Sequence, residues 1–181
     1  MDYTLQLSTT RLHLVLAERH LRRQVMTGLT ARLAQRGVVR LLDGGNSFDG
    51  YGLARVLHQQ SPQWQAALER ISVARAFTCY QMAALLSQTD ALPRSTLVLD
   101  LLDTFCDENT PFSDRRRLLE QCIDHLQRLC QPAQVAVSVC MPLPSIQGEQ
   151  LAERLIDAIG QAGGKVWSFT AAVSQPQPRL F

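Results

Sequence analysis

Lysine is almost absent from this chain: of its 18 basic residues, only Lys165 is a lysine. A phosphate-binding loop of the Gly-x-x-x-x-Gly-Lys-Ser/Thr type needs glycines that let backbone N–H groups wrap the phosphates, and a lysine that contacts their oxygens. Lys165 does follow Gly163-Gly164, but the glycine spacing is wrong and a strand pattern comes next. We interpret this segment as a glycine turn after a helix, so the sequence has no recognisable phosphate loop.

Metal-binding and disulfide patterns are missing as well. The five cysteines form no Cys-x-x-Cys pair, which argues against a zinc site and against a disulfide framework. The four histidines lack the spacing of metal ligands, and no Ser/His/Asp arrangement of a hydrolase stands out. We therefore predict no metal, no cofactor and no catalytic residue.

Long apolar runs are also absent. No stretch approaches the roughly 18 uncharged apolar residues of a membrane span, and Met1-Asp2-Tyr3-Thr4 is not a basic segment followed by an apolar one. We expect a cytoplasmic protein without a membrane partner. The formal net charge of +2 is too small to indicate nucleic acid by itself, but it is compatible with a local basic patch.

Short apolar runs do alternate with longer segments of helical period, which is typical of βαβ units in a mainly parallel sheet. With 181 residues, the chain has the size of one domain, which we assign to residues 1–174 with a tail over 175–181. The expected strands are Leu12–Leu16, Val38–Leu42, Ile71–Ala76, Thr96–Leu99, Val135–Cys140 and Lys165–Thr170. The expected helices are Leu21–Arg36, Gly50–Gln60, Cys79–Gln88, Asp114–Cys130 and Glu149–Ile159, with Gly37 and Gly160 as C-caps.

Ligands of such sheets bind beyond the carboxyl ends of the strands, so the segment after the second strand is a candidate site. It contains Asp43 and Asp49 within a run of Gly, Asn, Ser and Asp. These two acids can serve a site. The alternative, which we favour, is a structural turn, because Gly, Asn, Asp and Ser fill tight turns for steric reasons.

The stretch Ala74-Arg75-Ala76-Phe77, followed by a polar turn and Gln81, resembles the strand-to-helix segment of the RecA-type recombinases. In the same register, Asp43 to Phe48 is similar to the family's D-T-E-G-T-F segment, and Thr96 to Asp100 is similar to its Walker B strand. The resemblance covers roughly residues 12–141. It implies an α/β fold of three layers, RecA-like and of the P-loop NTPase type, with a mainly parallel sheet flanked by helices.

The departures from that family concern its ATP chemistry. The phosphate loop is absent, the family's catalytic glutamate falls on Gly45, and its polar pair after the fifth strand falls on Cys140-Met141. Only the Walker B aspartate, Asp100, is retained, and we interpret it as a structural acid. Without groups that position water and hold phosphates, phosphoryl transfer has no support. The resemblance therefore implies a pseudo-ATPase that binds no nucleotide.

The family's first DNA-binding loop would correspond to residues 107–117, where Arg115, Arg116 and Arg117 are consecutive. These arginines can neutralise nucleic-acid phosphates. The alternative is a solvated first helical turn capped by Ser113 or Asp114. The second loop would correspond to Leu143–Gln150, which has no basic residue, so direct DNA binding is weakly supported.

The tail ends in Gln177-Pro178-Arg179-Leu180-Phe181. It resembles the Q-x-x-L-F peptide by which bacterial repair proteins dock on the replicative sliding clamp. Gln177, Leu180 and Phe181 match the three defined positions of that peptide. The alternative is that Leu180 and Phe181 pack back onto the core.

Together these observations favour a non-catalytic RecA-like adaptor in DNA repair, recombination or the damage (SOS) response, similar in kind to recombinase paralogues and ImuA-type mutagenesis accessory proteins. Its expected partners are a sliding clamp, a recombinase or a translesion polymerase complex, with weak DNA contact and a homodimer as further possibilities. One alternative is an inhibitor of cell division resembling SulA. Another is an enzyme with a degenerate nucleotide site built from Asp43, Asp49 and Asp100.

Overall fold

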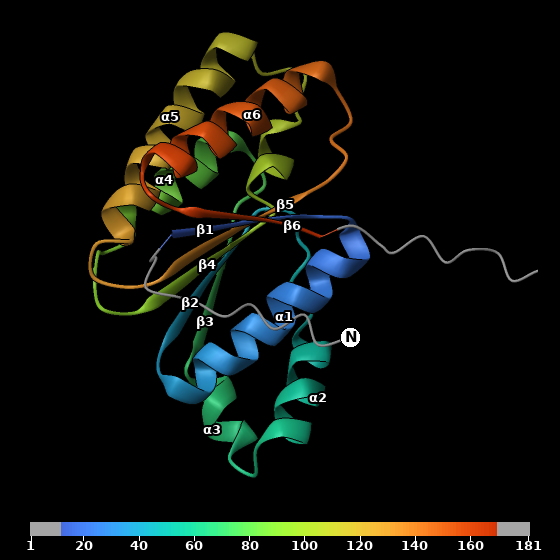
Figure 1. The fold of residues 1–181 in the computed structure, drawn as a ribbon, viewed down its shortest axis with the longest axis vertical. Coiled ribbons are helices and arrows are strands. Elements are labelled where there is room, and N and C mark those ends of the chain that lie inside the picture. The colour runs from blue at the N-terminus through green and yellow to red at the C-terminus, as the bar shows by residue number, and fades with distance from the viewer. Residues whose placement is uncertain (1–11, 170–181) are drawn as a thin grey trace, which may run out of the picture.

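The computed structural model describes residues 12–169, and they form one six-stranded sheet covered by helices on both faces (Figure 1). The strands are β1 (Leu12–Ala17), β2 (Val39–Asp43), β3 (Ile71–Arg75), β4 (Ser95–Leu99), β5 (Val135–Cys140) and β6 (Lys165–Phe169). The helices are α1 (Arg19–Arg36), α2 (Gly50–Gln60), α3 (Trp64–Glu69), α4 (Cys79–Gln88), η1 (Leu101–Phe105), α5 (Phe112–Leu129) and α6 (Ile146–Gln161).

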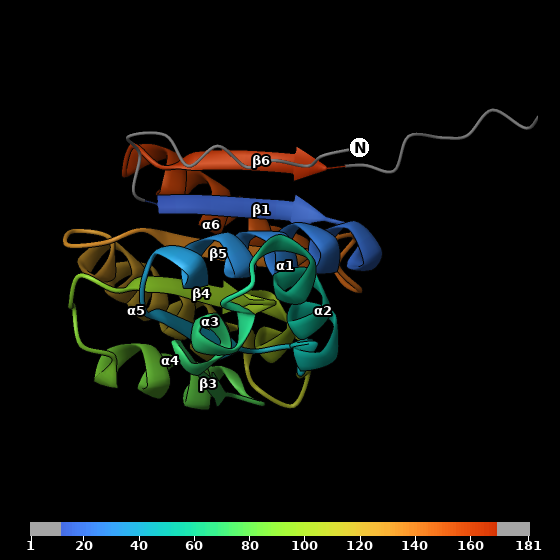
Figure 2. The same cartoon turned by 90° about the horizontal axis from the view of Figure 1, so that it is seen from below.

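The strand order is β3-β2-β4-β5-β1-β6, and every neighbouring pair is parallel. Helices α1, α2 and α3 cover one face, and α4, α5 and α6 cover the other (Figures 1 and 2). Each layer of helices buries its own apolar cluster against the sheet. The predicted α/β fold of three layers is thus confirmed, with a sheet that is wholly parallel.

The inner strands explain why the sequence forms this sheet. Every residue of β1 is buried, and β5 (VAVSVC) is buried along nearly its whole length. A strand covered on both faces needs such a continuous apolar run. At the edge, β3 has only half-buried and exposed residues. No helix among residues 12–169 is both long enough and apolar enough to cross a membrane.

The predicted elements match the observed ones within a few residues, with four differences. The short helices α3 and η1 were not expected, since neither is long enough to show a helical period. Gly37 does follow α1, but Gly160 lies inside α6, whose C-cap is Ala162. The N-cap of α5 is Pro111, so the expected caps Ser113 and Asp114 were wrong.

Candidate functional site

The carboxyl ends of the central strands bring polar residues from four elements together, and three of these residues are charged. Asp43 ends β2, Asp100 directly follows β4, and Ser138 lies near the end of β5. Arg22 reaches them from the first turns of α1. The chain leaves β2 toward one face of the sheet and β4 toward the other, and ligands of open parallel sheets bind at such a change of direction. This cluster is therefore the first place to look for a site.

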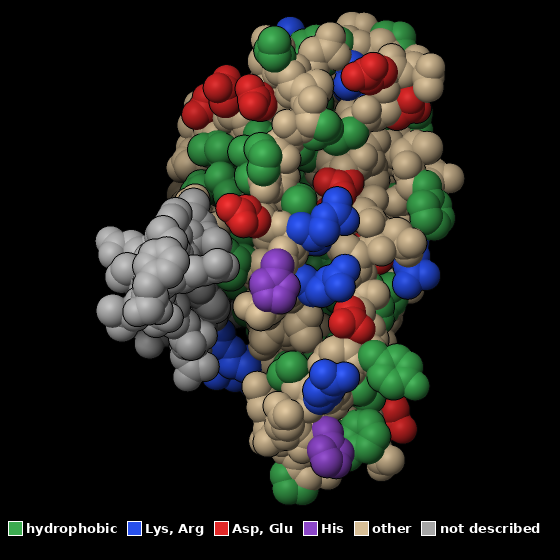
Figure 3. Space-filling view, turned by 90° about the vertical axis from the view of Figure 1, so that its right-hand side faces the viewer, with side chains coloured by type: hydrophobic (Ala, Val, Ile, Leu, Met, Phe, Trp, Pro, Cys, Tyr) green, Lys and Arg blue, Asp and Glu red, His purple; other side chains and the backbone are tan. Residues whose placement is uncertain are grey.

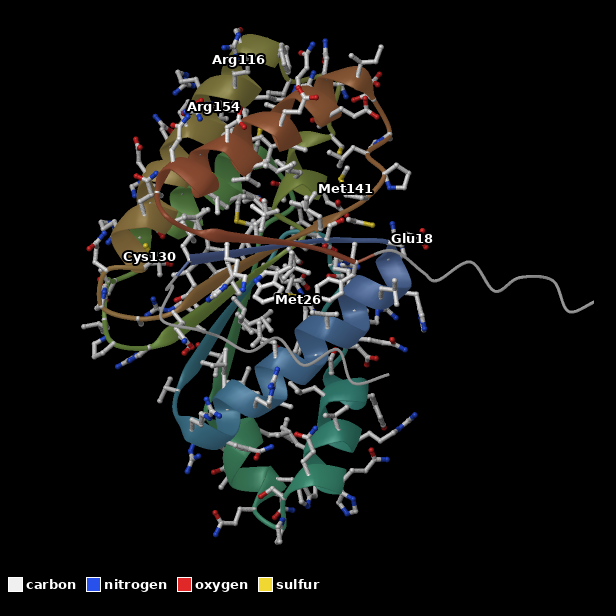
Figure 4. All side chains as sticks on the ribbon, viewed as in Figure 1. Glu18, Met26, Arg116, Cys130, Met141 and Arg154 are labelled. Carbon is white, nitrogen blue, oxygen red and sulfur yellow. The ribbon has the colours of Figure 1, made fainter. Side chains whose placement is uncertain are left out.

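The connection between β1 and α1 is too short for a phosphate loop. Glu18 is the only residue between the strand and the helix (Figure 4). The helix is regular from its start, because the N–H of Arg22 already donates to the carbonyl of Glu18 at 2.9 Å. No glycine lies near this junction, so the backbone does not form the N–H cradle that phosphates require.

The Arg22 side chain fills the space beyond these strand ends. Its side chain is 2% exposed, and Nη1 donates both to Asp100 Oδ2 in a buried ion pair and to Ser47 Oγ at 3.1 Å. The positive charge of Arg22 thus lies directly against the Asp100 carboxylate. Asp100 is neutralised from inside the fold rather than by an external cation.

Two further N–H groups of Arg22, on Nε and Nη2, are buried without a hydrogen-bond partner among the described residues. A cavity of about 20 Å³ lies beside them, lined also by Thr30 and Ser47. This volume has room for about one water molecule. The guanidinium therefore has space for a small hydrogen-bond partner but none for a nucleotide phosphate.

Asp100 is fixed by its backbone as well as by Arg22. Its backbone is left-handed, with φ 51° and ψ 51°, which Asp tolerates better than most residues. Its N–H donates to Ser138 Oγ at 3.1 Å, and the same hydroxyl lies 3.4 Å from Asp100 Oδ1. These contacts confirm the prediction that Asp100 is a structural acid at a strand end.

Two glycines allow the loop after β2 to approach Asp100. A Cβ on Gly44 would lie 2.8 Å from the carbonyl oxygen of Asp100. A Cβ on Gly45 would lie 2.6 Å from both Cβ and Oδ2 of Asp100, and 2.9 Å from Asp103 Oδ2. A side chain at position 45 thus has no room, so the glutamate that the RecA-type family carries there does not fit this arrangement.

Burial raises the pKa of Asp100 and of the neighbouring Asp103. For Asp100, the neighbouring Arg22 guanidinium opposes the increase in pKa that burial causes. For Asp103 in η1, burial and the negative charge of Asp100 both raise the pKa. Burial also raises the pKa of the Cys140 thiol at the end of β5, so this cysteine is not an activated nucleophile.

We expect Asp103→Asn to raise the free energy of unfolding at neutral pH. Because the folded-state pKa of Asp103 lies above its ordinary value of 3.8, the wild type loses stability as the pH rises from that value through the folded-state pKa. Asparagine avoids this loss, so the advantage of the variant should disappear as the pH falls to about 4. Urea unfolding of both proteins from about pH 4 to pH 7 measures it.

The control for this experiment is Glu108→Gln, which removes an exposed acid from the following loop. It should give a much smaller change. A difference between Asp103→Asn and wild type that stays constant over the whole pH range would contradict the assignment.

Asp43 holds the loop after β2 in place. Its Oδ1 accepts from the N–H of Ser47 at 2.9 Å, and its Oδ2 accepts from the N–H of Phe48 at 3.1 Å. Arg75 lies 3.4 Å from the same Oδ2. Asp49 does not join the cluster, because it caps α2 by accepting from the N–H of Gly52 at 2.9 Å. The interpretation of both acids as turn residues is confirmed.

The segment that resembles recombinases has a local structural role. Arg75 pairs with Asp43, and the N–H of Ala76 donates to the carbonyl of Asp43 at 3.1 Å. Thr78 caps α4 by accepting from the N–H of Gln81 at 3.2 Å, while Gln81 Oε1 accepts from the N–H of Phe77 at 2.8 Å. This reciprocal arrangement is a form of capping box. The motif therefore fixes the path from β3 into α4.

The predicted group of three arginines does not form one basic patch. Arg115 is buried, donates to the Phe105 carbonyl at 3.1 Å and to Gln147 Oε1, and so is not available to DNA. Arg117 is exposed but lies 3.7 Å from Asp114. Arg116 lies on the outer side of α5, in a groove that also contains Glu120 (Figure 4). The DNA-contact prediction was thus wrong for Arg115.

The other sequence predictions fall in different places. Most of the segment Leu143–Gln150 is the first turn of α6 rather than a loop. Gln177, Leu180 and Phe181 lie outside the described residues. Within residues 12–169, no group of three or more His, Cys, Asp or Glu side chains is placed to hold a metal ion.

The residues that the sequence did not single out are Arg22, Ser47, Asp103 and Ser138. A signal existed for Arg22, because it lies four and seven residues before Met26 and Leu29 on the buried face of α1. A basic residue on an apolar helix face indicates a buried acidic partner. No such signal exists for the two serines.

No protein-family model matches the chain, and a search of curated proteins also gave no match.

Proposed function

We propose that this protein is a RecA-like pseudo-ATPase that acts by binding other proteins and performs no catalysis. The observation that carries the proposal is the buried ion pair between Arg22 and Asp100. An ATPase needs this place for magnesium and for the β- and γ-phosphates. In this chain, the guanidinium of Arg22 lies against Asp100 in the place of the metal and the phosphates.

Two further features support the loss of catalysis. The one-residue connection at Glu18 leaves no phosphate loop, and the close approach of Gly45 to Asp100 leaves no room for a glutamate that positions water. Loss of these parts removes both charge stabilisation and positioning of the nucleophile. The alternative of an enzyme that uses Asp43, Asp49 and Asp100 has little support, because turns and a helix cap already use the carboxylates of Asp43 and Asp49.

The edge of the sheet at β3 supports a role in protein binding. Within the described residues, β3 pairs with β2 on one side only. Along this edge and the start of α4, Val73, Phe77 and Tyr80 expose apolar side chains, with Phe77 67% exposed. An open strand flanked by exposed apolar side chains is a common platform for an added strand or a partner loop. We therefore place partner binding at this edge.

The biological setting of the proposal is bacterial DNA repair or the damage response, in the cytoplasm. It rests on the resemblance of residues 74–81 to RecA-type recombinases and on the Q-x-x-L-F sequence at Gln177–Phe181. The partners it implies are a sliding clamp, or a recombinase or translesion polymerase complex.

We expect removal of residues 177–181 to abolish retention of the protein on an immobilised sliding clamp. The peptide binds through Gln177, Leu180 and Phe181, so Arg179→Ala should be retained like wild type. A pull-down with purified clamp and the three proteins measures this. Equal retention of the truncated and full-length chains would rule out the clamp as the partner of this tail.

A further inference from the structure

The two layers of helices carry opposite charge. Residues 18–75, which include α1, α2 and α3, contain nine arginines and four acidic residues. Residues 76–164, which include α4, α5 and α6, contain six arginines and eleven acidic residues. These groups of helices cover opposite faces of the sheet (Figure 2). The counts therefore give the molecule a basic face and an acidic face, although its net charge is only +2.

The surface beside the carboxyl ends of the strands shows the same division. In the space-filling view, most red side chains lie over the upper half of the molecule, and blue and purple side chains gather over the lower half (Figure 3). The lower half is the layer of α1 and α2 in Figure 1.

Three arginines of this lower half are available to a ligand. Arg19 and Arg23 on α1 and Arg55 on α2 are exposed. None of the three makes an ion pair or a side-chain hydrogen bond with another described residue. The charge of Arg19 does act on Asp103, where it opposes the rise in pKa that burial causes. The arginines at the start of α5 are buried, in an ion pair or in a groove with an acid. Surface arginines without an ion-pair partner favour an anionic ligand.

The spacing of these residues gives each helix a continuous stripe. Arg19 and Arg23 are four residues apart and thus lie on one side of α1. On α2, Tyr51, Arg55 and His58 follow at intervals of four and three and share one side of that helix. Tyr51 is 89% exposed, so its ring is accessible to a ligand. The helices are neighbours, since Arg23 and Leu53 line the same cavity.

We propose that this stripe, formed by Arg19, Arg23, Tyr51, Arg55 and His58, binds the backbone of single-stranded nucleic acid. The forked guanidinium groups bind phosphates, and Tyr51 provides a face on which a base stacks. The role of this stripe in DNA repair rests on the proposed function. The expected DNA contact thereby moves from α5 to α1 and α2.

A single strand fits the stripe better than an acidic protein segment does. A protein segment would leave Tyr51 with no specific partner, whereas every base offers a flat aromatic surface. Base stacking and phosphate contact also need no deep pocket, and the cavity between this part of α1 and α2 measures only about 20 Å³.

The test is fluorescence anisotropy of a labelled oligodeoxythymidine of about 20 nucleotides, titrated with the full chain at low salt. Three phosphate contacts predict a slope of about −2 in a plot of log K against log salt. The variant R19E/R23E/R55E should weaken binding about tenfold or more, and Tyr51→Ala should weaken it a few-fold. Acids in the first turn of a helix are favourable, so Arg19→Glu should leave α1 folded.

The matched control is R116E/R117E, which changes two exposed arginines on the acidic face. It should bind like wild type, and far-UV circular dichroism should show the same fold for every variant. Loss of binding in this control, with the triple variant unaffected, would overturn the proposal. Absence of saturable binding to the oligonucleotide would also overturn it. Displacement of the oligonucleotide by polyglutamate, together with no effect of Tyr51→Ala, would indicate that the ligand of this stripe is an acidic protein instead. None of these outcomes depends on nucleotide binding or on the clamp, so the proposed function can fail or stand separately.

Discussion

Replacement of Arg22 by alanine is expected to lower the free energy of unfolding by about 3–5 kcal/mol. The substitution leaves Asp100, which is 1% exposed, without its cationic partner, and removes the donor to Ser47. An uncompensated buried charge is among the largest single costs a fold can carry. Urea unfolding followed by circular dichroism measures the change.

The matched control for this variant is Arg23→Ala, one residue along the same helix. Arg23 is exposed and makes no ion pair with a described residue, so its loss should cost less than about 0.5 kcal/mol. Neutralising both members of the buried pair, as in R22M/D100N, should recover much of the stability, because asparagine also tolerates the left-handed backbone at position 100. Similar costs for Arg22→Ala and Arg23→Ala would show that the ion pair is not buried in solution.

Gly45→Ala is expected to cost about 1–3 kcal/mol, although the change adds only one methyl group. That methyl group would lie 2.6 Å from Asp100, which Arg22 and Ser138 hold in place. Gly45→Glu should cost more, because it also adds a third carboxylate beside Asp100 and Asp103. Urea unfolding at neutral pH compares the variants with wild type.

Gly28→Ala serves as the control for position 45. Gly28 lies inside α1, and a Cβ there meets nothing within 4 Å. Alanine should therefore stabilise the protein by about 0.5–1 kcal/mol. Tolerance of alanine at both positions would contradict the close approach of the β2 loop to Asp100.

The fold could be predicted from the sequence to the extent that local patterns determine it. The buried runs of β1 and β5 and the periodic segments of α2 and α4 were placed within a residue or two. The order of the strands could not be predicted, because it depends on which apolar faces meet in three dimensions. The helices α3 and η1 were missed because so short a segment shows no period.

The site was only half predictable for a similar reason. Asp43 and Asp100 were found because they end strands, but Arg22 and Ser138, the partners of Asp100, come from elements distant in sequence. The helical period contained a signal that was not used. Arg22 lies on the apolar side of α1, and Arg115 lies on the apolar side of α5, three and four residues before Leu118 and Leu119. Both positions indicate burial, and both arginines are buried.

The central claim is that side chains of this chain occupy the place of the nucleotide. Isothermal titration of the full-length protein with ATP and magnesium tests it most directly, because binding needs no knowledge of a partner. We expect no saturable heat, because we propose that Arg22 fills the phosphate position and because the one-residue connection between β1 and α1 forms no phosphate loop. Saturable heat that depends on magnesium, with about one ATP bound per chain, would contradict it.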